Sequence, residues 1–211
     1  MALALPLDEF ERRIQARSPE PLGAGTVAAL HLHYRLLLRW NEQTSLVGPG
    51  TIDEAAEIHY GESLAGLPLL GDMAGRTVVD IGSGAGFPGF VLAAARPAAH
   101  VALVEARERK WSFLKAVASE SGLAVDCVLG TVDRSLPKGF PGRIDYVTLR
   151  ALKLSARAWQ SVLSSLAPNG RVLIWAGLEP PGFPPALCIS RTVEIPQTRS
   201  KRILELVRSG G

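Results

Sequence analysis

The sequence has few of the residues that build disulfide frameworks or metal clusters. Its 211 residues include only 2 cysteines, Cys127 and Cys188, and 4 histidines. Two cysteines so far apart indicate neither a disulfide scaffold nor a zinc site, so we expect no metal and a reducing, cytoplasmic location. The first residues lack the basic lead and apolar stretch of a secretory leader, so no signal peptide is expected. No apolar run approaches the length of a membrane span, and we expect no membrane partner.

Charge is unevenly distributed, although the formal net charge is only +3. Residues 1–75 carry 5 arginines against 10 acidic residues, a net charge of −5, whereas residues 76–211 carry 18 lysines and arginines against 10 acidic residues, a net charge of +8. A basic half of this kind can attract a polyanion such as RNA. The last segment contributes Arg191, Arg199, Lys201, Arg202 and Arg208. Many basic domains bind no nucleic acid, so charge alone leaves this question open.

Two different patterns meet near residue 75. Before it, helical spacing predicts helices at 8–17, around 30–41 and from Thr51 or Asp53 through Leu70, which together form a helical N-terminal extension over residues 1–75. After it, strands are expected at 77–81, 101–105, 125–129, 144–149 and 171–175, and helices at about 88–95, 107–121 and 153–166. Residues 168–170 are expected to form a turn, and Pro180, Pro181, Pro184 and Pro185 to flank a loop. Late strands near 188–195 and 203–207 complete a second domain over residues 76–211.

This alternation predicts the fold class α/β, with a mainly parallel, Rossmann-like sheet that carries helices on both faces. The most informative segment is residues 77–89, where a β-branched strand is followed by an acid and four glycines. Glycines permit positive φ and close approach of a ligand to the backbone, so we expect this strand-to-helix turn to bind one. Residues 84–89 also match Gly-x-Gly-x-x-Gly, which alone is a weak indication of a nicotinamide-dependent oxidoreductase.

Asp80 favours a methyl donor over a dinucleotide at this turn. Its carboxylate stands two residues before the first glycine and is expected to point at the bound ligand. That charge would repel a pyrophosphate on the helix N-terminus, but it would attract the ammonium and sulfonium of S-adenosylmethionine. Glu105 ends the next strand and suits the ribose hydroxyls of either ligand. We therefore expect S-adenosylmethionine, wrapped at its methionine end by the backbone from Gly82 to Gly86, with Gly82 and Gly84 as cofactor contacts.

Several motifs together resemble the RsmG/GidB family of bacterial methyltransferases. They are residues 80–89 (Asp-Ile-Gly-Ser-Gly-Ala-Gly-Phe-Pro-Gly), residues 103–105 with Lys110 and 113–114, residues 149–151, and Trp40-Asn41 and His59 in the helical extension. The resemblance implies a class I S-adenosylmethionine-dependent methyltransferase. It also implies methyl transfer to a guanine N7 of 16S ribosomal RNA, with ribosomal RNA or the small ribosomal subunit as partner. We expect the protein to act as a monomer.

The resemblance also implies the positions of cofactor contacts, which fall on Gly82, Phe87, Val132, Asp133 and Arg150. Phe87 would offer an apolar wall, Val132 would pack on the adenine ring, and Asp133 would accept from the adenine amino group. Arg150 would bind the cofactor carboxylate or a substrate phosphate.

The chain departs from the family pattern where RNA would lie. The altered positions are Ser45, Val47, Ile58, Thr131 and Ala176, and three of them replace a cation of the pattern. A methyltransferase with another acceptor and a non-catalytic RNA- or ribosome-binding protein therefore stay open as alternatives. Guanine N7 carries a lone pair and no proton, so its methylation requires no catalytic base. For an acceptor that must lose a proton, the candidates are His59 and Glu62.

Overall fold

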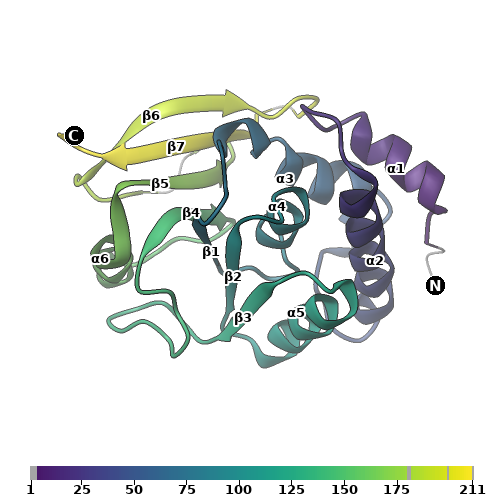
Figure 1. Cartoon of the computed structure of the whole chain (residues 1–211), viewed down its shortest axis with the longest axis horizontal. Helices are drawn as coiled ribbons and strands as arrows, with labels where there is room; N and C mark the ends of the chain where they lie inside the picture. Colours follow the sequence, from purple (N-terminus) through teal and green to yellow (C-terminus); the bar gives the residue numbers. More distant parts are fainter. Residues whose placement is uncertain (1–3, 180–181, 199, 211) are drawn as a thin grey trace.

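The computed structural model describes residues 4–179, 182–198 and 200–210, so that Pro180, Pro181 and Arg199 lie outside the described residues. The described chain forms a seven-stranded sheet in the order β3-β2-β1-β4-β5-β7-β6 (Figure 1). The strands are β1 (Thr77–Ile81), β2 (His100–Glu105), β3 (Val125–Leu129), β4 (Ile144–Arg150), β5 (Leu166–Ala176), β6 (Leu187–Glu194) and β7 (Arg202–Arg208). Strands β1 to β5 pair in parallel, and β7 runs antiparallel between β5 and β6. The predicted sheet and its closing hairpin are therefore confirmed.

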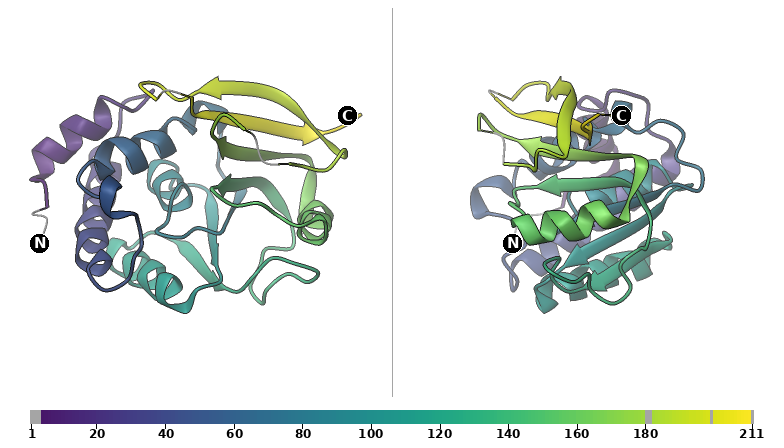
Figure 2. Two further views of the ribbon diagram at one scale, coloured as in Figure 1. Left: turned by 180° about the vertical axis from the view of Figure 1, so that it is seen from behind. Right: turned by 90° about the vertical axis from the view of Figure 1, so that its left-hand side faces the viewer.

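Helices cover both faces of the sheet (Figures 1 and 2). On one face lie α4 (Gly89–Ala95) and α5 (Glu108–Ser121). Helix α2 (Ala24–Asn41) packs against these two, and α1 (Leu7–Gln15) packs against α2. On the other face lies α6 (Ala156–Ser165), whose Trp159 and Val162 pack on β1, β4 and β5. Strands β1 and β2 are thus buried on both sides, which explains their nearly continuous apolar runs.

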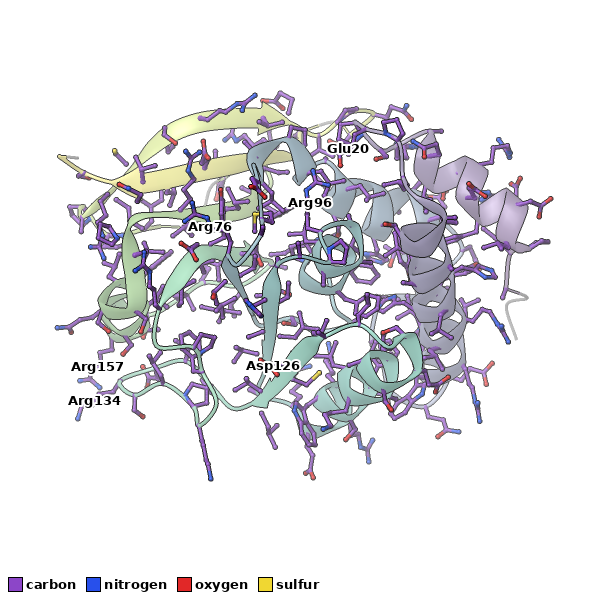
Figure 3. All side chains as sticks on the ribbon, in the orientation of Figure 1. Glu20, Arg76, Arg96, Asp126, Arg134 and Arg157 are labelled. Atoms are coloured by element: carbon purple, nitrogen blue, oxygen red, sulfur yellow. The ribbon has the colours of Figure 1, made fainter. Side chains whose placement is uncertain are left out.

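The helical extension shares its core with the sheet. Phe10 and Tyr60 of the extension belong to the same cluster of buried side chains as Phe90 of α4 and Phe113 of α5. An ion pair adds to this contact, because the Arg96 guanidinium just after α4 binds the Glu20 carboxylate at 2.9 Å (Figure 3). The extension is therefore packed on the sheet, and the division of the chain into two domains stays a prediction.

The third predicted helix, from residue 51 or 53 through Leu70, is wrong as a continuous element. It is divided into a 3-10 turn, η1 (Pro49–Thr51), a π-helical segment, η2 (Ala56–Gly61), the short α3 (Glu62–Leu64) and a second 3-10 turn, η3 (Leu67–Leu69). Tertiary contact with β5 accounts for this, because the Trp175 indole N–H donates to the Glu62 carbonyl oxygen at 2.7 Å. A Cβ on Gly66 would lie 2.6 Å from the Trp175 ring, so the chain approaches that ring too closely for any side chain at position 66.

Two smaller predictions also differ from the structure. Residues 168–170, expected to form a turn, lie within β5, because Leu166 already pairs with Ile144 before an irregularity in the ladder. Helix α6 begins at Ala156 rather than at residue 153, because the Ser155 hydroxyl accepts the Ala158 N–H and caps the helix there. In the part of the chain that is described, no helix is both long and apolar enough to cross a membrane.

Candidate cofactor and substrate site

A cavity of ≈ 790 Å³ opens at the carboxyl ends of β1, β2, β3 and β4. The strand order reverses between β1 and β4 at this edge, which is where open α/β sheets bind their ligands. The lining comes from both parts of the chain: residues 46–47 and His59 from the extension, and residues 81–85, 87, 104–107, 110, 130–133, 150–155 and 158 from the sheet and its loops. The extension therefore supplies one wall of a site whose floor is the sheet.

The glycine turn after β1 forms the centre of this floor. Gly82, Gly84 and Gly86 adopt φ values of +74°, +58° and +87°, which other residues rarely adopt. A Cβ on Gly82 would also lie 2.8 Å from the Leu152 side chain. The turn thus needs glycine for its backbone path and for its packing, and it presents backbone to the cavity as predicted.

Glu105 lies at the tip of β2 and braces the turn. Its two carboxylate oxygens accept the N–H of Gly84 at 2.9 Å and the N–H of Arg107 at 2.8 Å. A carboxylate has about four acceptor positions, so Glu105 keeps capacity for two ligand hydroxyls. The predicted role for Glu105 toward a ribose fits this geometry.

The loop after β3 places Val132 and Asp133 on the opposite side of the cavity. Val132 is buried among the side chains beneath α6, so its position is fixed. The Asp133 side chain is exposed and accepts from the Ser155 hydroxyl at 3.2 Å, which leaves its other oxygen free to accept from a ligand. These two residues fit an adenine ring, because Val132 can pack on the ring and Asp133 can accept a hydrogen bond from its amino group.

Asp80 does not lie where the sequence places it. Its side chain is buried beneath the turn and is absent from the lining of the cavity. One oxygen accepts the Thr148 hydroxyl at 2.7 Å, and the other accepts the N–H of Gly89, the first residue of α4, at 3.2 Å. Burial raises the pKa of Asp80 to about 6, although these hydrogen bonds oppose the rise. The prediction that Asp80 points at the ligand is therefore wrong, because its carboxylate anchors α4 to β1 and β4.

Arg150 ends β4 and lines the cavity. Its guanidinium donates to a Glu62 carboxylate oxygen at 2.7 Å, and Lys201 from the β6–β7 connection binds the other oxygen. Burial lowers the pKa of Arg150, while Glu62 and Asp80 raise it. Glu62 itself is buried, with both oxygens occupied, and it does not line this cavity. The prediction of Glu62 as a candidate base is therefore wrong, because its carboxylate binds two cations instead.

His59 lines the cavity and stacks on Phe87, with ring centroids 5.1 Å apart and an interplanar angle of 24°. An Arg150 N–H faces its Nδ1 at 3.4 Å, so Nε2 carries the proton and donates to the Thr51 hydroxyl at 2.9 Å. Burial, with the nearby cations Arg150 and Lys201, lowers the pKa of His59 to about 3. This imidazole is neutral near pH 7 and a weak base, and it forms a flat wall together with Phe87.

Sequence reasoning missed His33. Its imidazole is fully buried behind the glycine turn, with Nε2 2.8 Å from the Ala85 carbonyl oxygen. The signal was its spacing, since position 33 falls on the same stripe of α2 as Leu30 and Leu37, which are also fully buried. Lys110, which belongs to the motifs of the family resemblance, also lines the cavity.

Cations gather around the mouth of the cavity. Arg107, Lys110 and Lys153 line it together with Arg150. Two further arginines project outward on the side of α6 and of the loop after β3, namely Arg157 and Arg134 (Figure 3). Of the departures from the family pattern, Val47 and Thr131 line the cavity, whereas Ser45, Ile58 and Ala176 do not.

Residues 26–180 match the GidB family, described as rRNA small subunit methyltransferase G. The chain belongs to this family. The ribosomal RNA small subunit methyltransferase G of Sorangium cellulosum (strain So ce56) is 38% identical over 174 residues, which are 82% of this chain and 72% of the relative. The protein of the same name from Paramagnetospirillum magneticum (strain ATCC 700264 / AMB-1) is 36% identical over 152 residues, which are 72% of this chain and 71% of the relative.

Solved structures of similar fold include a SAM-dependent methyltransferase from Aquifex aeolicus, with a TM-score of 0.58 and 16% identity over 79% of this chain and 97% of the other. A mutant of MtNAS in complex with S-adenosylmethionine aligns with a TM-score of 0.59 and 16% identity over 96% and 89% of the two chains. At this identity the structures show the fold alone. Family and fold together confirm the predicted methyltransferase class and its cofactor, S-adenosylmethionine, and the oxidoreductase alternative is wrong.

Proposed function

We propose that this protein transfers the methyl group of S-adenosylmethionine to a guanine N7 of 16S ribosomal RNA. The observation that carries the proposal is the composition of the cavity. It combines a glycine turn and two carboxylates suited to the cofactor with a flat aromatic wall and a rim of cations suited to RNA. The relatives are named for the ribosomal RNA of the small subunit, which supports this choice of acceptor.

The cofactor is assigned to the turn and the two strand tips beside it. We assign the ribose hydroxyls to Glu105, the adenine ring to Val132 and Asp133, and the methionine end to the backbone from Gly82 to Gly84. Phe87 borders that end as an apolar wall. Arg150 is assigned to the cofactor carboxylate, because it lines the cavity and because Glu62 and His59 use only part of its N–H fork.

Methyl transfer to guanine N7 requires no proton transfer by a side chain. When bound, S-adenosylmethionine supplies a methyl group activated by its sulfonium. Guanine N7 attacks with a lone pair that carries no proton, so His59 need not act as a base, and its lowered pKa of about 3 suits it poorly to that role. His59 and Phe87 instead give the acceptor base a surface to stack on and exclude water from the reacting atoms. Orientation of the two reactants then accounts for most of the rate.

RNA is held by charge outside the cavity. Arg107, Lys110 and Lys153 line the mouth, where a phosphate backbone would approach an extruded or unpaired base. We further propose that the protein acts as a monomer in the cytoplasm, where ribosomal subunits are present.

A methyl-transfer assay tests the function. Tritiated S-adenosylmethionine is incubated with the protein and with small ribosomal subunits, or their naked RNA, from a strain that lacks its own enzyme of this family. We expect one methyl group per 16S RNA and none in RNA of the large subunit. Cofactor binding without transfer to any RNA would favour a non-catalytic RNA-binding role, and transfer to another acceptor would replace ribosomal RNA as the substrate.

A further inference from the structure

His33 lies at the centre of a buried contact between the helical extension and the glycine turn. Its ring stacks on Phe90 of α4, with centroids 4.8 Å apart and an interplanar angle of 19°. Its edge faces Phe87 of the turn at 5.2 Å. A Cβ on Gly86 would lie only 3.1 Å from His33 Nε2, so glycine at position 86 allows this close approach. The imidazole of α2 therefore packs directly under the backbone of the turn.

The hydrogen bonds of His33 have one possible direction. Nε2 donates to the Ala85 carbonyl oxygen at 2.8 Å, because a carbonyl can only accept. Nδ1 must then accept from the Tyr60 hydroxyl, which lies 2.5 Å away. Burial lowers the pKa of His33 to about 4, so the ring is neutral and holds this single tautomer. A chain of two hydrogen bonds thus runs from Tyr60 through His33 to Ala85.

Ala85 is the point at which this chain of hydrogen bonds meets the site. It lines the cavity and lies between two glycines with positive φ, whose own N–H groups bind Glu105 and the Ser83 carbonyl oxygen. Without His33, its buried carbonyl would lack the donor seen here, and the turn would relax to find another. The position of the turn therefore depends on a side chain from outside the sheet.

The same contacts reach the acceptor side of the cavity. Tyr60 follows His59 in the π-helical segment η2, and Phe87 faces both rings, with centroids 5.0 Å from Tyr60 and 5.1 Å from His59. Insertions of π-helix often occur at functional sites. Here the segment directs His59 to the cavity and Tyr60 to His33, so it contacts the cofactor turn and the acceptor wall at once.

We propose that His33 is a positioning residue for S-adenosylmethionine, which fixes the cofactor turn through the Ala85 carbonyl and links it through Tyr60 to the helical extension. The inference rests on the proposed binding of the cofactor's methionine end at the turn. It predicts that the extension contributes to cofactor affinity although its His33 and Tyr60 side chains do not line the cavity.

The test compares three variants of the full chain by calorimetric titration with S-adenosylhomocysteine, well below the unfolding temperature of each. His33→Leu keeps volume but removes the donor, and we expect affinity to fall about tenfold or more. His33→Gln keeps an N–H near Nε2, and we expect it to restore affinity to within about threefold of wild type. Phe113→Leu is the control, because Phe113 packs edge-on against the His33 ring at 5.5 Å without a bond to the turn. It should lower stability and leave affinity unchanged.

The kinetic readout separates positioning from general destabilisation. In the methyl-transfer assay, His33→Leu should raise KM for S-adenosylmethionine more than it lowers kcat. If His33→Leu fails to fold, Tyr60→Phe replaces it, and a severalfold loss of affinity without loss of secondary structure is expected. Wild-type affinity in His33→Leu, or an equal loss in His33→Gln and His33→Leu, would overturn the inference. Absence of binding by the wild-type protein would instead overturn the proposed cofactor site.

Discussion

The Glu62 carboxylate binds Arg150 at 2.7 Å and also binds Lys201, so one buried acid joins the helical extension to β4 and to the β6–β7 connection. The side chains of Arg150 and Glu62 are only 16% and 6% exposed. This ion pair holds the largely buried Arg150 side chain in place at the cavity, and its loss should lower both stability and activity.

The first prediction concerns this pair. Glu62→Gln removes the carboxylate that binds the largely buried Arg150, and we expect the free energy of unfolding to fall by about 3 kcal/mol in urea titrations. Glu9→Gln is the control, since Glu9 pairs with Arg12 and Arg13 on the surface of α1 and its loss should leave stability unchanged. Equal stability of Glu62→Gln and wild type would contradict the role given to this pair.

The second prediction concerns the pH dependence of stability. The pKa of Asp80 is about 6 in the folded protein, above the usual 3.8, so burial penalises the ionised form. The free energy of unfolding should therefore rise as the pH falls from about 6 to 4, and the contribution of Asp80 should reach about 3 kcal/mol. Asp80→Asn lacks this titration, and the difference between the two stability curves isolates it. A difference that is constant over this range would show that Asp80 does not titrate there.

The third prediction separates two roles for the same residue. Because the Asp80 carboxylate binds Thr148 and Gly89 rather than the cavity, Asp80→Asn should retain affinity for S-adenosylhomocysteine within about threefold. Calorimetric titration at neutral pH measures this. A loss of affinity of about a hundredfold would instead support the direct electrostatic contact between Asp80 and the cofactor that the sequence suggested.

The fourth prediction concerns the approach of α4 to the sheet. A Cβ on Gly89 would lie 2.4 Å from a Leu103 methyl and 2.5 Å from the Asp80 Cβ, so Gly89→Ala should lower the free energy of unfolding by about 2 kcal/mol or more. Gly25→Ala is the matched control, because nothing lies within 4 Å of its Cβ position in helix α2. That change should raise stability by about 0.5–1 kcal/mol. Similar effects of the two substitutions would refute the packing argument.

The strands were predictable because their sequences carry local information. Residues 77–81 and 125–129 form strands with the predicted bounds, since apolar runs are bounded there by turn residues. The division of the third helix was not predictable, because this part of the chain packs against Trp175, which lies 113 residues beyond its hydrogen-bond partner Glu62. The alternation of side chains along β1 does indicate where Asp80 points. Val79 and Ile81 face α6, so Asp80 between them must face α4. This direction contradicts the interpretation that Asp80 points at the ligand.

The same contrast between local information and distant contacts applies to the residues of the site. Glu105, Val132 and Asp133 lie on the cavity because strand ends of a parallel sheet meet at one edge, which sequence order alone establishes. His33 and the Glu62–Arg150 pair depend on packing between segments 52 and 88 residues apart in the chain. Such pairs become visible only when the extension is seen on the sheet.

The fifth prediction concerns the pH dependence of methyl transfer. His59 has a pKa of about 3, so it stays neutral between about pH 5.5 and 8, and its titration should leave no trace in the rate over this range. Single-turnover rates at saturating cofactor and RNA measure this. A rise in rate with a midpoint near 6.5 that disappears in His59→Gln would show that His59 acts as a base.

The most direct test of the account identifies the methylated atom. The wild-type protein labels RNA from tritiated S-adenosylmethionine, and the RNA is digested to nucleosides. The labelled product is separated by chromatography and identified by mass spectrometry. The cavity, with an aromatic wall and a neutral His59 as its only histidine, predicts that all label lies in 7-methylguanosine from one position of 16S RNA. Label in a nucleoside methylated on an exocyclic amine or a ribose hydroxyl would contradict it, because those acceptors must give up a proton.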